Sequence, residues 1–88
     1  MRMTLPKVGS IVVVNWLDAN SYGAGWKHKE ELDGQLLKCS TVGWLMRDDK
    51  KTISMAATAS EDESVTDACV IPKSFITKVT VLKRKKVK

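Results

Sequence analysis

The chain has 88 residues, of which 43% are hydrophobic and 28% are charged, and its formal net charge is +5. A chain of this length buries only about two-thirds of its unfolded surface, so we expect one domain with a small core that oligomerisation helps to stabilise. The longest apolar run is far shorter than the roughly 20 residues of a membrane span, and the N-terminus lacks a signal-peptide pattern, so we expect a soluble, cytoplasmic protein.

The first predicted element is a β-strand over residues 11–16 (IVVVNW). β-branched residues dominate it, and a proline and a glycine precede it, as is typical of the start of a strand. Residues 18–25 then form a Gly-rich loop. Such loops carry binding residues more often than the elements that they connect, so this loop is the first candidate for function.

Aromatic and basic side chains meet at the end of this loop. Tyr22 and Trp26 offer flat aromatic faces, and the basic run at residues 27–29 adds positive charge. This mixture stacks bases and holds phosphates in nucleic-acid-binding proteins. The expected ligand-binding residues are Tyr22, Trp26, Lys27, His28 and Lys73. The structural alternative is that Trp26 plugs the open end of a small barrel while the lysines are merely solvated.

The same region lacks the pattern of a catalyst. Its glycines are not followed by the Gly-Lys-Ser/Thr end of a phosphate-binding loop. His28 is the only histidine, and general acid–base catalysis needs a matched partner, for which Asp18 and Glu31 are the candidates. No His/Cys spacing supplies a set of metal ligands. We therefore expect a protein that is not an enzyme and holds no metal or other cofactor.

A short helical turn over residues 29–32 is expected next. The pair Asp33-Gly34 breaks any longer helix, and a strand begins near Gln35. Residues 39–57 predict a β-hairpin, with a β-branched and aromatic strand at 39–46, a polar tip at 47–51 and an alternating strand at 52–57.

An acidic, solvated loop is predicted over residues 58–67. It is rich in Ser, Thr, Asp and Glu and lacks apolar positions to bury. Its acids are Glu61, Asp62, Glu63 and Asp67. They lack the fixed spacing and the turn glycine of a calcium loop, so we expect them to be solvated rather than to hold a metal.

The last predicted elements are two strands joined by a tight turn. Residues 68–71 form a short strand that Pro72 ends, because proline cannot donate to the ladder. Residues 73–75 form a single helical turn, and residues 76–82 form the closing strand. The total is about five strands.

The two cysteines lie inside predicted strands. Cys39 and Cys69 have no companion ligands for zinc, so we expect buried free thiols. A disulfide is the alternative if the two strands are neighbours, although a reducing cytosol opposes it.

The excess positive charge lies at the C-terminus. Five of the fifteen basic residues are in residues 83–88, so residues 1–82 carry ten basic and ten acidic side chains. We therefore divide the chain into a domain at 1–82 and a disordered basic tail at 83–88. The tail contacts nucleic acid through Lys83, Arg84, Lys85 and Lys86, or it is a solubilising end that protects the last strand from pairing with another chain.

The order of elements resembles that of Sm-like and SH3-like β-barrels. The strings at residues 15–19 (NWLDA), 25–26 (GW), 41–45 (TVGWL) and 71–76 (IPKSFI) are similar to uncharacterised small proteins of tailed phages and prophages, over about residues 8–82. The resemblance implies a small, five-stranded, oligomeric barrel of phage origin, located in the host cytoplasm. It supplies no catalytic residue.

Two functions are expected from these features. The first is a phage-type binding protein, a homo-oligomer that captures an anionic ligand, either single-stranded nucleic acid or a nucleotide signal that it sequesters from a host defence. The second is a protein–protein interaction module that binds or inhibits a host or virion factor through the acidic loop or an exposed strand edge.

Overall fold

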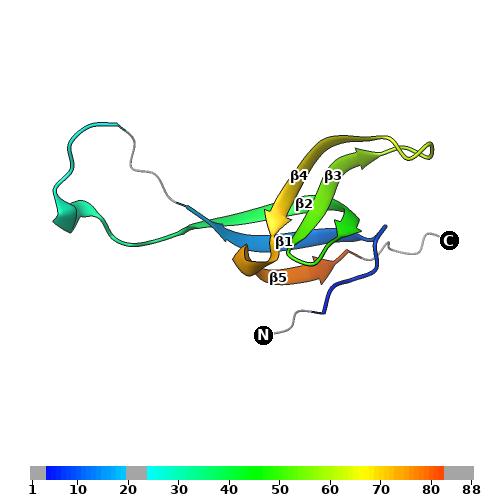
Figure 1. Cartoon of the computed structure of the whole chain (residues 1–88), viewed down its shortest axis with the longest axis horizontal. Coiled ribbons are helices and arrows are strands. Elements are labelled where there is room, and N and C mark those ends of the chain that lie inside the picture. Colours follow the sequence, from blue (N-terminus) through cyan, green and yellow to red (C-terminus); the bar gives the residue numbers. More distant parts are fainter. Residues whose placement is uncertain (1–3, 20–23, 83–88) are drawn as a thin grey trace.

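The fold is one antiparallel β-sheet. The computed structural model describes residues 4–19 and 24–82, so the predictions for Tyr22 and for the basic tail lie outside the described residues. The strands are β1 (Ile11–Asp18), β2 (Leu37–Asp48), β3 (Thr52–Ala59), β4 (Val65–Pro72) and β5 (Ile76–Val81). Their order across the sheet is β4-β3-β2-β1-β5, so the chain meanders through four strands and returns β5 to the free side of β1 (Figure 1).

These strands confirm a mainly β fold with five strands. Two 3-10 turns interrupt them in the described part of the chain, η1 (Lys29–Glu31) and η2 (Lys73–Phe75), and both lie where the sequence predicts a helical turn. β4 and β5 are the two edges of the sheet, and the described ladders do not join them. Closure into a barrel therefore stays a prediction.

The core lies inside the curved sheet and is built from alternate residues of the strands. Side chains that point to one face of a strand recur every second residue, and the buried ones follow this period in β1 and, apart from Ala56, in β3. The buried cluster consists of Val12, Val14, Leu45, Ile53, Met55, Ile71 and Ile76, against which Leu5, Trp16 and Val79 pack. Burial of each side chain of this type stabilises the folded state by about 1.5–3 kcal/mol. With seven buried side chains in its cluster, the described core is small, as the chain length predicts.

Several predicted boundaries are wrong, in each case because a strand is longer than its apolar run. β2 begins at Leu37, close to the start predicted near Gln35, but it continues through Asp48 into the predicted polar tip. β3 and β4 extend to Ala59 and Val65, so the acidic loop is confined to residues 60–64. The ladder pairs Thr58 with Thr66 and Ala59 with Val65 there, because backbone pairing needs no burial of side chains.

The chain between β1 and β2 forms an arm that projects from the sheet (Figure 1). The β1–β2 ladder ends at the pair Asp18 and Leu37, and the described residues of the arm are 19 and 24–36. Every described side chain from residue 24 to residue 36 is exposed. The molecule consequently measures 57 × 31 × 29 Å.

Candidate ligand-binding site

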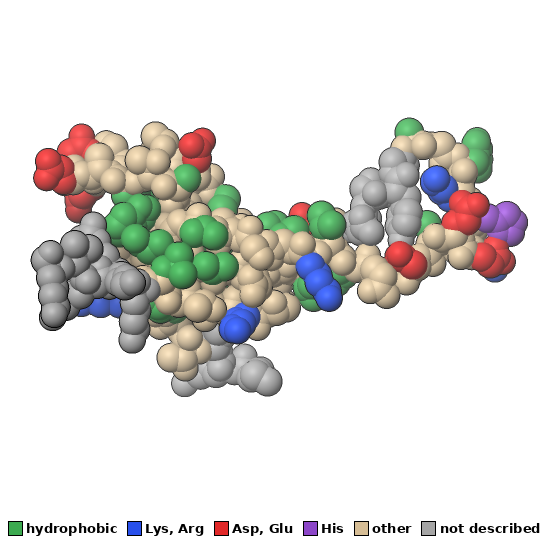
Figure 2. Space-filling model, turned by 180° about the vertical axis from the view of Figure 1, so that it is seen from behind, with side chains coloured by type: hydrophobic (Ala, Val, Ile, Leu, Met, Phe, Trp, Pro, Cys, Tyr) green, Lys and Arg blue, Asp and Glu red, His purple; other side chains and the backbone are tan. Residues whose placement is uncertain are grey.

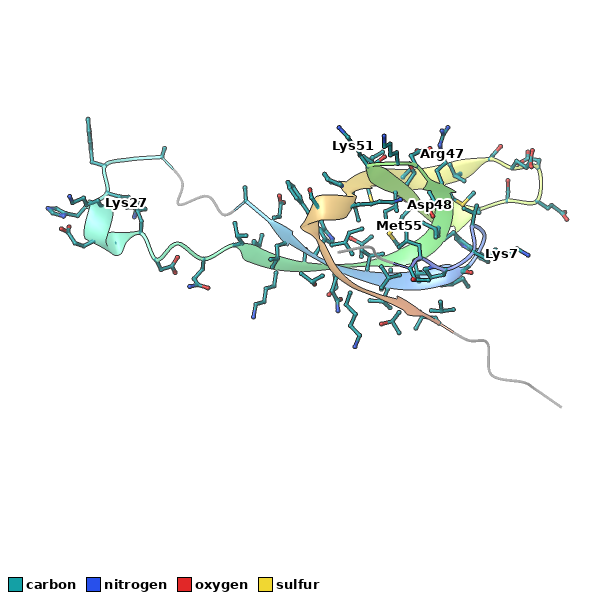
Figure 3. The ribbon with its side chains drawn as sticks, turned by 60° about the horizontal axis from the view of Figure 1, so that its bottom comes forward. Lys7, Lys27, Arg47, Asp48, Lys51 and Met55 are labelled. Atoms are coloured by element: carbon teal, nitrogen blue, oxygen red, sulfur yellow. The ribbon has the colours of Figure 1, made fainter. Side chains whose placement is uncertain are left out.

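The residues predicted to bind a ligand lie in two separate parts of the molecule. Trp26, Lys27 and His28 lie in the arm, whereas Lys73 lies in η2 on the body of the sheet. Figure 3 shows Lys27 at the tip of the arm and Asp48, the ion-pair partner of Lys73, at the far side of the body. The structure therefore does not bring the predicted residues together.

Trp26 is fully exposed, with a relative accessibility of 102%. The alternative in which Trp26 plugs the end of a barrel is wrong, because the arm carries this side chain away from the core. Trp16 takes the packing role instead. It lies against the core cluster, and its Nε1–H donates to the hydroxyl of Thr41 at 3.0 Å.

His28 has a local carboxylate partner that the sequence does not single out. Its Nδ1 contacts a carboxylate oxygen of Glu30, two residues along the chain, rather than Asp18 or Glu31. Both side chains are exposed at the arm tip. Water and ions screen an exposed pair strongly, so this pair is an ordinary surface contact.

Lys73 makes structural contacts within the body of the sheet. Its Nζ lies 2.5 Å from Oδ1 of Asp48, and its backbone N–H donates to the carbonyl of Lys51 at 2.8 Å. These two contacts fasten η2 to the β2–β3 hairpin tip. A lysine held in this way joins structural elements, and its charge is already neutralised by a carboxylate.

A hollow of about 540 Å³ lies at the base of the arm, where β1, β2 and β5 meet. Three strands contribute to its lining, which consists of Asn15, Trp16, Leu17, Lys38, Cys39, Ser40 and Thr77. The sequence contains one signal for this site. Asn15 and Ser40 are polar residues within otherwise β-branched and aromatic strands, and the ladder pairs them directly.

Hydrogen bonds fix the polar centre of the hollow. The hydroxyl of Ser40 donates to Oδ1 of Asn15 at 2.9 Å, and the hydroxyl of Thr77 donates to the backbone carbonyl of Asn15 at 3.1 Å. Thr77 can reach that carbonyl because the β1–β5 register shifts between Asn15 and Trp16 and leaves it as an extra residue. With its oxygen engaged, the Asn15 amide has its two N–H groups as donors for a ligand.

Two lysines flank this polar centre on the same face of the sheet. Lys78 is the direct cross-strand partner of Asn15, and Lys38 lies two residues before Ser40 on β2. Residues opposite each other in a ladder, and residues two apart along a strand, share a face. Neither lysine forms an ion pair with any residue between 4 and 19 or between 24 and 82. The hollow therefore offers ammonium and amide donors, which is the chemistry that binds anions.

The cysteines do not form a metal or disulfide site. Both are free, and they lie on β2 and β4, which β3 separates. Cys39 is half-buried at the hollow, whereas Cys69 is exposed, so the prediction of two buried thiols is wrong for Cys69. Within the two described ranges, no group of three or more His, Cys, Asp or Glu side chains could hold a metal ion.

Comparison of the chain with protein-family models, curated proteins and solved structures gave no match. The resemblance to small phage proteins therefore stays a prediction. The described part of the chain contains no helix with the length and apolar character that a membrane span requires.

Proposed function

We propose that this chain is a non-enzymatic binding protein that captures an anionic ligand in the hollow at the base of its arm. The observation that supports the proposal is the Asn15–Ser40 pair, which lies between Lys38 and Lys78 on one face of the sheet. Two lysines that form no ion pair with any described residue attract an anion, and the Asn15 amide adds directed hydrogen-bond donors.

The apolar part of the lining favours a nucleotide or nucleic acid over a simple inorganic anion. Trp16 and Leu17 border the same hollow as Lys38. Phosphate groups would contact the lysines, while a base or sugar would cover apolar surface beside them. Single-stranded nucleic acid and a nucleotide signal share this chemistry. The phage resemblance adds the proposal that such a signal is sequestered from a host defence.

The arm extends the same chemistry beyond the hollow. It carries Trp26 with Lys27 and Lys29, and all three side chains are exposed. A single strand that is longer than one nucleotide would reach from the hollow toward the arm, where Lys27 and Lys29 would contact its phosphates. We propose that the basic tail adds sequence-independent phosphate contacts.

Fluorescence anisotropy with labelled oligo(dT) and with labelled nucleotides tests the proposal. Lys38→Gln and Lys78→Gln should each weaken binding, and each should flatten the dependence of log K on log salt concentration by about 0.7 for a single strand. Lys50→Gln at the hairpin tip is the matched control, because it removes the same charge outside the hollow. Equal losses in all three variants, or no binding of any anion, would contradict the proposal.

A second candidate function is protein–protein interaction, including assembly into a homo-oligomer. The specific observation is the number of large apolar side chains that a small chain leaves exposed on its edges and its arm. β4 is an edge strand of the sheet, and its first six residues are all exposed. The acidic turn that precedes it carries Glu61, Asp62 and Glu63. Unpaired edges recruit other chains unless they are covered.

A further inference from the structure

The outer face of β1 and β2 carries an apolar stripe that the single chain covers only in part. The ladder pairs Ile11 with Trp44 and Val13 with Val42, so these four side chains form two adjacent cross-strand rows on one face. They lie on the side opposite the core, because Val12 and Val14 between them are fully buried. Val42 is 57% exposed at the middle of this stripe. Figure 2 shows hydrophobic side chains gathered on the body as seen from behind.

The arm carries a second apolar surface. Its exposed members are Trp26, Leu32 and Leu36, followed by Leu37 at the start of β2. Burial of one tryptophan alone removes about 150–250 Å² from water, so leaving this side chain fully exposed forgoes a large stabilisation. Single exposed hydrophobic residues are ordinary, but four within twelve positions of one projecting segment mark an interaction surface.

The arm cannot cover the stripe of its own chain. It leaves the sheet along the axis of the β1–β2 ladder, beyond the pair Asp18 and Leu37, whereas the stripe lies toward the other end of the same two strands. Figures 1 and 2 show the arm at one end of the long axis and the body at the other. Each chain therefore presents two unmatched apolar surfaces that do not meet.

We propose that the arm of one copy packs on the outer face of β1 and β2 of a second copy, and that the exchange is reciprocal. A two-fold axis near the base of the arm turns each arm back over the body of the other copy, so both unmatched surfaces are covered at once.

A second copy fits this role because it brings both surfaces in equal number. The reciprocal exchange produces two arm-to-face contacts, and it extends a core of only seven clustered side chains. This assembly specifies the partner for the homo-oligomer proposed above. The contacts that the inference rests on are apolar, and neither Trp26 nor Val42 lines the hollow.

Sedimentation velocity of the full chain across micromolar concentrations tests the inference. We expect the mass of two chains. Trp26→Ala in the arm and Val42→Gln on the face should each raise the dimer dissociation constant about tenfold or more, as expected for a central apolar contact. Val65→Gln is the matched control, since Val65 is also an exposed valine but lies on the β4 edge. Its dimer should be unchanged.

An equimolar mixture of the Trp26→Ala and Val42→Gln proteins distinguishes reciprocal exchange from other arrangements. The mixed dimer joins an intact arm to an intact face once, so it should form more tightly than either variant alone. A single-chain mass at every concentration would overturn the inference, and so would an oligomer that only Val65→Gln weakens. A mass that grows steadily with concentration would indicate open head-to-tail assembly and would overturn the two-fold exchange. Anion binding by the same variants reports separately on the hollow.

Discussion

Gly43 of β2 faces the backbone of Ala56 on β3 so closely that a Cβ atom at position 43 would lie 2.5 Å from the Ala56 carbonyl oxygen. The neighbouring pair Trp44 and Ala56 is the first of the β2–β3 ladder, so Gly43 stands where the two strands come together. This close approach of the two backbones explains why a glycine occupies position 43. The absence of a side chain lets the sheet curve over its core.

Gly43→Ala should destabilise the fold. The obstructing atom belongs to the backbone, so relief requires the strands to separate rather than a side chain to turn. Overpacking of this kind costs about 1–3 kcal/mol. Urea denaturation followed by circular dichroism measures the loss as a lower midpoint with an unchanged slope. An unaltered midpoint would show that β2 and β3 have more room than the structure indicates.

The hydrogen bond from Trp16 to Thr41 should contribute to stability. Thr41→Val keeps the shape of the side chain but removes the acceptor, which leaves the part-buried indole N–H unpaired. We expect a loss of about 0.5–1.5 kcal/mol and a change in the near-ultraviolet signal of the tryptophans. Thr66→Val, at an exposed position of β4, controls for the exchange of threonine for valine. Equal effects of the two substitutions would argue against the hydrogen bond.

Much of the fold follows from patterns within short stretches of sequence. The β-branched runs at residues 11–16 and 39–46 identify β1 and the centre of β2, and Pro72 marks the end of β4 before η2. The strand ends could not be predicted in the same way. Pairs such as Thr58 with Thr66 depend on a neighbouring strand, and their side chains stay exposed, so no hydrophobic pattern marks them.

The candidate site could not be read from the sequence because its residues are distant along the chain. Asn15 and Ser40 meet through the β1–β2 ladder, and Lys78 joins them only through the return of β5 to the free side of β1. A continuous run such as residues 26–29 draws attention in a sequence, yet in the structure it lies at the tip of an arm. The paired polar residues inside apolar strands are the signal that points to the hollow.

Lys73 should act in stability rather than in ligand binding. Lys73→Gln removes its ion pair with Asp48 while keeping a polar side chain of similar length. Both partners are partly exposed, so we expect a loss of at most about 1 kcal/mol. Anion affinity, measured by the anisotropy assay, should fall no more than in Lys50→Gln. A double-mutant cycle with Asp48→Asn measures the coupling energy of the ion pair. If this energy is near zero and Lys73→Gln weakens anion binding, Lys73 belongs to the ligand-binding site instead.

The acidic turn between β3 and β4 should respond to pH through Asp62. Hydrogen bonds from the hydroxyl of Ser60 and from Ser64, whose backbone N–H donates to Oδ1 of Asp62 at 3.0 Å, lower the pKa of the Asp62 carboxyl below its ordinary value. A lowered pKa means that the folded chain holds the ionised form more strongly than the unfolded chain does. The resulting stabilisation is therefore complete above the unfolded pKa of about 3.9, and it is lost as the pH falls through the lower folded value.

A carboxyl NMR titration measures this directly. The Asp62 signal should titrate below the ordinary value of an aspartate. Ser60→Ala removes the first hydrogen bond and should raise the pKa of Asp62 toward its ordinary value, whereas Ser74→Ala in η2 should leave it unchanged. An ordinary pKa for Asp62 in the unaltered protein would contradict the prediction. The turn would then be stabilised by its backbone hydrogen bonds, such as that from the Ser60 N–H to the Ser64 carbonyl at 2.9 Å, and not by the Asp62 carboxylate.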